Sequence, residues 1–185
     1  NADRAHLYRL DVDHPEPLVP LERCVGVHER IGPDGILNPL ALETLPDVDA
    51  EAIAGQSPRP VDYGNVPSCT YCRPQVASIG LTEAAARTGG REIAVGKFPF
   101  TASGKAVAQG DTEGFVKVVA DKATGELLGA HIVGPEATEL IHEFAVGRTL
   151  EATLDEIIHT IHAHPTLSEA ALEATLAALG HPIHI

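Results

Sequence analysis

The order of strand-like and helix-like segments constrains the fold of this chain more than any other feature. Apolar residues follow strand patterns between residues 66 and 133, whereas from residue 135 onward they follow helical spacing. Two of the strands, residues 115–120 and 126–133, are joined by a short loop that ends in Gly125, which is typical of a β-hairpin. Strands followed by helices predict an α+β fold, with an antiparallel β-sheet and helices packed on it.

Three helices are expected after the sheet. They begin at Pro135, Thr153 and Thr166, and the last two starts carry the T-x-x-E pattern of a capping box. The third helix stops before Gly180 and is apolar almost all round. Such a helix has to be covered on several sides, so we expect it to lie between its own sheet and a second subunit, at a dimer interface. The remaining expected elements are strands at residues 68–71, 76–79 and 92–100, a short helix at 82–88, and a loop or helical turn at 101–110.

The amino-terminal part of the chain reads differently. Six prolines interrupt every candidate helix in residues 1–49, so we expect loops and extended structure there. The chain is therefore predicted to consist of an irregular, Pro-rich segment, residues 1–49, and one α+β domain, residues 50–185.

Composition excludes several classes of partner. The formal net charge is −13 at pH 7, which argues against nucleic acid and against anionic membranes, because both attract basic surfaces. No apolar run approaches the ~20 residues that span a bilayer. Cys24, Cys69 and Cys72 form no disulfide framework, which indicates the reducing cytoplasm. Because the chain contains no methionine, we expect it to be a piece of a longer chain.

Residues 159–169 concentrate most of the titratable chemistry. The residue before a proline is pushed out of the helical region, so His164 is expected to be extended while Glu169 lies in the first turn of the third helix. The two side chains can then meet, and a carboxylate on one imidazole nitrogen raises the basicity of the other. This spacing fits a general base. It fits equally a Glu169 that only caps the backbone of Thr166, with His164 an ordinary loop residue.

A metal site is another interpretation of the same stretch. His159, His162 and His164 offer three nitrogens, and Cys69 and Cys72 offer two sulfurs. Structural zinc sites usually combine ligand pairs at set spacing, and only one C-x-x-C pair is present. We therefore expect no metal, a hydrogen-bonded core position for His162, and structural thiols rather than a redox couple.

Six segments carry a family resemblance. They are VPSCTYCRPQVASIGLTE (66–83), FPFTASGKA (98–106), GFVKV (114–118) onward, LGAHIVGP (128–135), HAHPTLSE (162–169) and GHPIHI (180–185). In this order they resemble the carboxy-terminal interface (dimerisation) domain of dihydrolipoamide dehydrogenases, in the pyridine nucleotide-disulfide oxidoreductase family. The resemblance runs from about residue 50 to residue 185, and its H-P-T-x-S-E motif is highly specific in that setting.

The resemblance implies a homodimeric flavoenzyme that oxidises dihydrolipoamide on the lipoyl domains of 2-oxo acid dehydrogenase complexes and passes electrons through a disulfide and FAD to NAD. It implies that His164 is the base that takes the substrate thiol proton and that Glu169 holds this histidine in place. Both residues would reach into the partner subunit's active site, where the backbone of His164 and Pro165 contacts FAD.

The resemblance also has gaps. The family's FAD-binding and NAD-binding domains, with their glycine fingerprints and redox disulfide, are absent from these 185 residues, which contain no G-x-G-x-x-G. Cys69 and Cys72 stand where many relatives carry valine and threonine, so they do not match the redox pair. We therefore expect the chain alone to hold neither FAD nor NAD and to be inactive, and to serve an oxidoreductase only together with those domains. The alternative is a stand-alone dimerisation or regulatory module in which the His164–Glu169 pair is idle.

Overall fold

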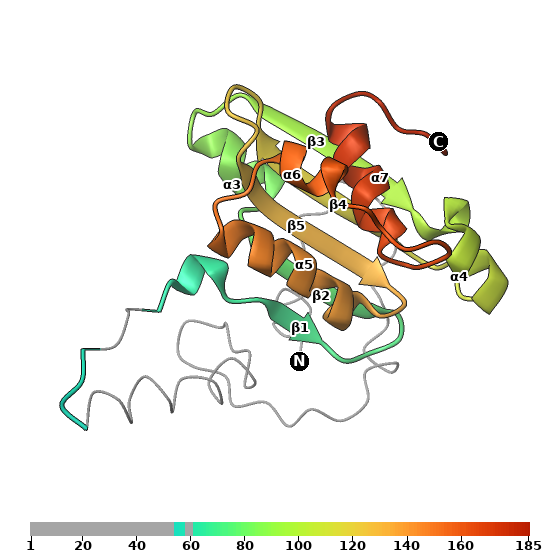
Figure 1. Ribbon diagram of the computed structural model, residues 1–185, viewed down its shortest axis with the longest axis horizontal. Helices are drawn as coiled ribbons and strands as arrows, with labels where there is room; N and C mark the ends of the chain where they lie inside the picture. Colours follow the sequence, from blue (N-terminus) through green and yellow to red (C-terminus); the bar gives the residue numbers. More distant parts are fainter. Residues whose placement is uncertain (1–53, 58–60) are drawn as a thin grey trace, which may run out of the picture.

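A five-stranded antiparallel sheet organises the part of the chain that the computed structural model describes, residues 54–57 and 61–185 (Figure 1). The strand order is β1-β2-β5-β4-β3, and every neighbouring pair is antiparallel. The strands are β1 (Ser68–Thr70), β2 (Gln75–Gly80), β3 (Ile93–Pro99), β4 (Phe115–Asp121) and β5 (Leu127–Gly134). The predicted hairpin is confirmed: β4 pairs with β5, and the loop between them contains Gly125 at a φ of +76°.

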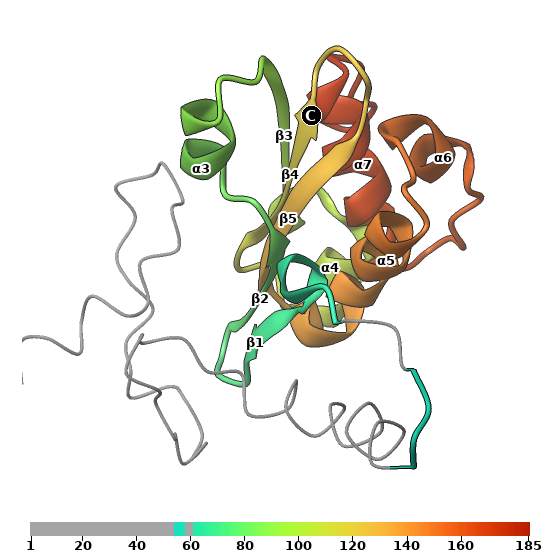
Figure 2. The same cartoon turned by 90° about the vertical axis from the view of Figure 1, so that its left-hand side faces the viewer.

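Helices cover the two faces of the sheet unequally. The three helices α5, α6 and α7 lie on one face, and the short α3 lies on the other (Figure 2). The helices are α3 (Glu83–Thr88), α4 (Gly104–Gln109), α5 (Ala137–Thr149), α6 (Leu154–His159) and α7 (Glu169–Ala178), with 3₁₀ turns η3 (Tyr63–Asn65) and η4 (Phe100–Ala102). The α+β architecture predicted from the order of strands and helices is therefore confirmed.

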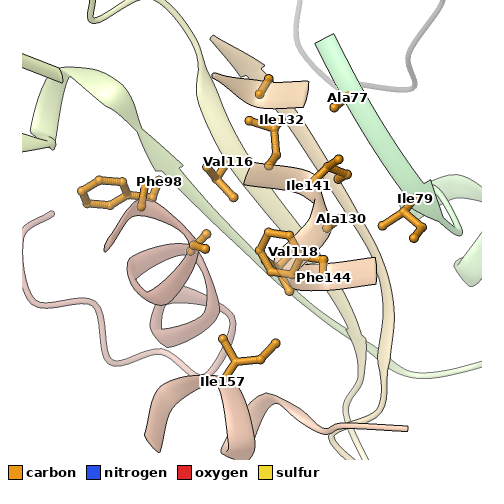
Figure 3. Packing of buried hydrophobic residues seen from close by; sticks show 14 of the residues in the cluster. Ala77, Ile79, Phe98, Val116, Val118, Ala130, Ile132, Ile141, Phe144 and Ile157 are labelled. Atoms are coloured by element: carbon orange, nitrogen blue, oxygen red, sulfur yellow. The ribbon is translucent and has the colours of Figure 1, made fainter. Parts of the chain in front are cut away.

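One hydrophobic core fills the space between the sheet and the three helices α5, α6 and α7. Alternate residues of the strands point into it, as the two-residue period of a strand requires, and Val116, Val118 and Ile132 are fully buried. They pack with Ile141 and Phe144 of α5 (Figure 3). Burial of one such side chain contributes about 1.5–3 kcal/mol, so this core fixes the helices on the sheet.

α7 lies directly on β3. A Cβ atom at Gly96 would come within 2.0 Å of the carbonyl oxygen of Ala174, so the missing side chain lets the helix approach the strand. Ala170 and Ala174 are fully buried at this contact. The first turn of α7, which carries Glu169, is thereby held against the sheet.

The start of α7 differs from the prediction. The T-x-x-E pattern predicts a helix that opens at Thr166 with a complete capping box, but α7 begins at Glu169. The Thr166 hydroxyl is engaged elsewhere, because it donates to the carbonyl oxygen of Ala163 (2.6 Å). Only the Glu169 half of the box forms. The capping box predicted at Thr153 and Glu156 is complete.

The predicted segment of residues 1–49 and its boundary at residue 50 lie outside the described residues. Within the described residues, no helix is long and apolar enough to cross a bilayer.

Candidate active site

His164 and Glu169 are brought together in the loop between α6 and α7. Nδ1 of His164 lies 2.8 Å from Oε1 of Glu169. His164 belongs to the exposed residues 163–165, whereas Glu169 is the first residue of α7, which packs on β3 and β4. A loop histidine is thus held by a carboxylate on an anchored helix.

The carboxylate of Glu169 uses its two oxygens for two partners. Oε1 faces His164, and Oε2 accepts a hydrogen bond from the backbone N–H of Thr166 (2.8 Å). The capping role and the contact with the imidazole therefore coexist. Burial raises the pKa of the Glu169 carboxyl, but the hydrogen bonds from Thr166 and His164 and the charges of His164 and His184 outweigh burial, so this pKa lies below its usual range. Glu169 is ionised near neutral pH.

This ionised carboxylate decides which nitrogen of His164 can act as a base. A carboxylate can only accept hydrogen bonds, so Nδ1 of His164 carries a proton, and in the neutral ring the lone pair lies on Nε2. The side chain of His164 is 78% exposed, which leaves Nε2 accessible to a ligand. The arrangement can serve as a general base whose tautomer is set by Glu169.

His162 forms a second imidazole–carboxylate pair, with Glu143 of α5. Its Nε2 lies 2.8 Å from Oε1 of Glu143, and its Nδ1 faces the carbonyl oxygen of Thr160 at 2.9 Å. The ring is only 4% exposed, as expected for a hydrogen-bonded core histidine. Sequence reasoning misses Glu143, because nothing in its helical pattern shows that a residue 19 positions later folds back onto it.

His159 joins neither pair. Its Nδ1 faces the carbonyl oxygen of Asp155 in α6 (2.8 Å), and its side chain is 73% exposed. The three histidines of the stretch therefore have three different partners. Among residues 54–57 and 61–185, no group of three or more His, Cys, Asp or Glu side chains is arranged to hold a metal ion.

Cys69 and Cys72 are free thiols near the edge of the sheet. Cys72 is buried, and its thiol donates to the carbonyl oxygen of Pro74 (2.9 Å). Burial and the charge of Glu139 raise the pKa of the half-buried Cys69 thiol, which makes it a weak nucleophile near neutral pH. Cys24 lies outside the described residues.

The carboxy-terminal tail contributes a pair that sequence reasoning also misses. Glu173 lies one turn after Glu169 on α7 and accepts hydrogen bonds from the backbone N–H groups of Ile183 (3.1 Å) and His184 (3.4 Å). Nδ1 of His184 lies 2.5 Å from Oε1 of Glu173. No local pattern in the sequence signals this pair, because the tail reaches Glu173 only when the chain turns back after α7.

Comparison with known proteins identifies the class of domain that carries this site. Residues 66–175 match the family described as pyridine nucleotide-disulphide oxidoreductase, dimerisation domain. The match covers more than half of the chain, and the chain belongs to this family.

The similar curated proteins are dihydrolipoyl dehydrogenases. The one from Rhizobium etli is 56% identical over 138 residues, which are 74% of this chain and 29% of the relative. The one from Halobacterium salinarum is 44% identical over 176 residues, 95% of this chain and 36% of the relative, so this similarity extends into residues 1–49. The chain thus spans about a third of the length of these relatives.

Solved structures share the described fold. LpdA from Mycobacterium tuberculosis aligns with a TM-score of 0.64 and 26% identity, over 69% of this chain and 28% of that chain. The HOCl-induced flavoprotein disulfide reductase RclA from Escherichia coli aligns with a TM-score of 0.66 and 26% identity, over 70% of this chain and 30% of that chain. The same α+β architecture therefore occurs in a flavoprotein disulfide reductase.

Proposed function

We propose that this chain is the interface domain of a dihydrolipoyl dehydrogenase and supplies His164 and Glu169 as the general base of the partner subunit's active site. The observation that carries the proposal is the 2.8 Å contact between Nδ1 of His164 and Oε1 of Glu169, beside an exposed ring. The similarity to dihydrolipoyl dehydrogenases supports dihydrolipoamide as the substrate, presented by the lipoyl domains of 2-oxo acid dehydrogenase complexes.

The chemical task of His164 is to remove the proton from a substrate thiol. Nε2 takes this proton, and Glu169 stabilises the resulting imidazolium because its carboxylate faces the opposite nitrogen. The substrate is left as a thiolate, which is the nucleophilic form for exchange with a disulfide outside this chain. The lowered pKa of Glu169 keeps its carboxylate charged while the proton moves.

We infer that FAD and NAD bind to domains outside this chain, because the chain spans about a third of its relatives' length and its 185 residues contain no glycine-rich dinucleotide turn. The residues whose backbone would contact a partner's FAD are His164, the candidate base itself, and Pro165, and both are exposed. A bound flavin would supply the two-electron redox chemistry that links the dithiol to NAD by way of a disulfide outside this chain. We expect the isolated chain to hold neither cofactor, and flavin absorbance that co-purifies with it contradicts that expectation.

A second subunit has an apolar surface to cover. Ala170, Ala171 and Ala174 of α7 are buried, whereas Leu172 and Leu176 are half-buried and Leu179, just after the helix, is exposed. Ile161 in the loop before α7 is 96% exposed, and Ile183 in the tail after it is 68% exposed. Large apolar side chains in all three segments support a homodimer whose second subunit packs against α7.

Complementation tests the proposal. The chain is mixed with a flavoprotein fragment of a dihydrolipoyl dehydrogenase that carries the FAD-binding and NAD-binding domains, and reduction of NAD by dihydrolipoamide is measured. We expect restored activity that falls about 10²–10⁴-fold with His164→Gln. His159→Gln is the matched control, because His159 is a similarly exposed histidine of the same stretch whose Nδ1 faces Asp155 of its own helix.

Two outcomes contradict the proposal. Restored activity that survives His164→Gln excludes His164 as the base. A complex that forms between the chain and the flavoprotein fragment, seen by sedimentation, but shows no activity favours a dimerisation or regulatory module with an idle His164–Glu169 pair.

A further inference from the structure

We propose that Glu173 and His184 form a clamp that fixes the carboxy-terminal tail along α7, and that His184, held by this clamp, is a positioning residue for Glu169. The contacts of the clamp stand on their own, whereas its consequence for catalysis rests on the proposed function.

The tail is anchored by one buried carboxylate. Glu173 is 4% exposed, and its two oxygens receive three groups of the tail: the backbone N–H of Ile183, the backbone N–H of His184 and the imidazole of His184. A carboxylate removed from water is costly unless it is hydrogen-bonded or paired. The tail therefore supplies the hydrogen bonds that the buried carboxylate of Glu173 requires, and the same bonds hold the tail in place.

The clamp also sets the direction of the tail. The chain leaves α7 after Ala178 and turns at Gly180, whose φ of +80° suits glycine. Because Ile183 and His184 then contact Glu173 in the second turn of α7, the tail runs back toward the start of the helix. The imidazole of His184 is thus placed along α7, toward the end of the helix where Glu169 contacts the candidate base His164.

Two carboxylates one turn apart on α7 each hold an imidazole. Glu169 holds His164 from the loop before the helix, and Glu173 holds His184 from the tail after it. Residues four apart lie on the same helix face, so the two pairs are neighbours. The charge of His184 accordingly adds to the hydrogen bonds and to the charge of His164 in keeping the pKa of Glu169 low against the effect of burial. The tail thus helps to keep ionised the carboxylate that contacts His164.

The test uses the full 185-residue chain without flavin or substrate. Hydrogen–deuterium exchange measures the protection of the amides of Ile183 and His184, and NMR of the side-chain carboxyl measures the titration midpoint of Glu169. Glu173→Gln is expected to speed exchange of both amides about tenfold, as for loss of a hydrogen bond to a charged group. His184→Gln is expected to raise the titration midpoint of Glu169, a change that a purely structural tail would not cause.

His181→Gln is the matched control. His181 lies exposed in the same tail and is held through its backbone N–H, which donates to the carbonyl oxygen of Leu176 (2.9 Å). This variant should change neither the protection of the amides nor the midpoint of Glu169.

Each negative result has a defined meaning. Unchanged amide protection in Glu173→Gln overturns the clamp, and an unchanged Glu169 midpoint in His184→Gln overturns the positioning role. His184→Gln alters a side chain that is 66% exposed, so it keeps the test decisive if Glu173→Gln fails to fold. Failure of complementation, with both expected results obtained on the isolated chain, counts against the proposed function and leaves the clamp in place.

Discussion

One carboxylate oxygen of Glu169 caps the start of α7, and the other contacts the imidazole of His164. These two contacts predict how the Glu169→Gln variant behaves. Glu169→Gln keeps an oxygen for the N–H of Thr166, but it loses the charge that stabilises a protonated His164. Its NH₂ group can also donate to Nδ1, which favours the wrong tautomer of the base. We expect the NAD-linked activity of the complemented enzyme to fall about 10²-fold or more while the circular dichroism spectrum is unchanged.

The control for this prediction is Glu92→Gln. Glu92 is 78% exposed and pairs with Lys122 on the surface, so this variant removes the same charge away from the candidate site. A comparable loss of activity in Glu92→Gln would show that the effect of Glu169→Gln comes from net charge alone.

The pKa of Glu169 also predicts a pH dependence of stability. Because its folded-state pKa lies below the unfolded value, the carboxylate stabilises the fold above the ordinary glutamate pKa, and this contribution disappears as the pH falls through the lowered folded-state pKa. Glu169→Gln should therefore be less stable than the unaltered chain near pH 7 and equally stable in acid. Urea unfolding midpoints at the two pH values measure this difference, and a gap that persists in acid contradicts the prediction.

The sequence alone predicts the residues of the candidate site only in part, and the reason lies in chain distance. His164 and Glu169 are five residues apart, so a proline and a helix start are enough to place them together. Glu143 and His184 reach their partners only because α5 and the tail fold back onto the same region. Such contacts depend on tertiary packing, which local spacing does not encode.

At the scale of elements, the contact of α7 with β3 depends on the absence of a side chain at Gly96. Gly96→Ala places a Cβ atom against the backbone of Ala174, and backbone cannot rotate away as a side chain can. We expect a loss of about 1–3 kcal/mol in the free energy of unfolding, measured by urea denaturation, with a lowered protection of the tail amides. Gly104→Ala is the matched control, since a Cβ atom there meets nothing within 4 Å. Equal effects of the two substitutions would contradict the close contact.

Arg148 of α5 contacts both β5 and the distant 3₁₀ turn η3. Its guanidinium donates to the carbonyl oxygens of Leu127 (2.8 Å) and Leu128 (2.5 Å) in β5 and to the side chain of Asn65 in η3 (3.0 Å). Lysine has a single ammonium and cannot reproduce this fork, so Arg148→Lys should cost about 1–3 kcal/mol of unfolding free energy. Arg73→Lys, at a side chain that is 79% exposed, should change the urea midpoint little. An Arg148→Lys variant with an unchanged free energy of unfolding would show that the forked contacts of the guanidinium contribute nothing to stability.

Elements with a local signal are the ones that the sequence predicts. The β4–β5 hairpin, the capping box of α6 and the helical turn within residues 101–110, now α4, each depend on neighbouring residues. The start of α7 differs from the prediction because the Thr166 hydroxyl donates to the carbonyl oxygen of Ala163 instead of capping the helix. The strand order across the sheet has no local signal, since it follows from which strands meet in the folded core.

At the scale of the whole molecule, the exposed side chains around α7 predict where two copies of the chain meet. Ile161 is 96% exposed and lies in the loop that also carries His164, so Ile161→Asp leaves the fold of one copy unchanged but places a charge where an apolar contact is expected. We expect the dimer to dissociate about 5–150-fold more readily, equivalent to about 1–3 kcal/mol, as measured by sedimentation over a concentration series.

Leu81→Asp is the control for the interface, because Leu81 is 42% exposed but lies on the α3 side of the sheet, where its carbonyl meets His131. Dissociation measured over a series of salt concentrations distinguishes the loss of an apolar contact from charge repulsion. Each copy carries a formal charge of −13, so association of the unaltered chain should tighten as added salt screens that repulsion. If Ile161→Asp acts only through its extra charge, high salt restores the dimer fully. If Ile161 is an apolar contact of the interface, the variant remains more dissociated than the unaltered chain at every salt concentration, and the candidate base lies where a partner subunit can receive it.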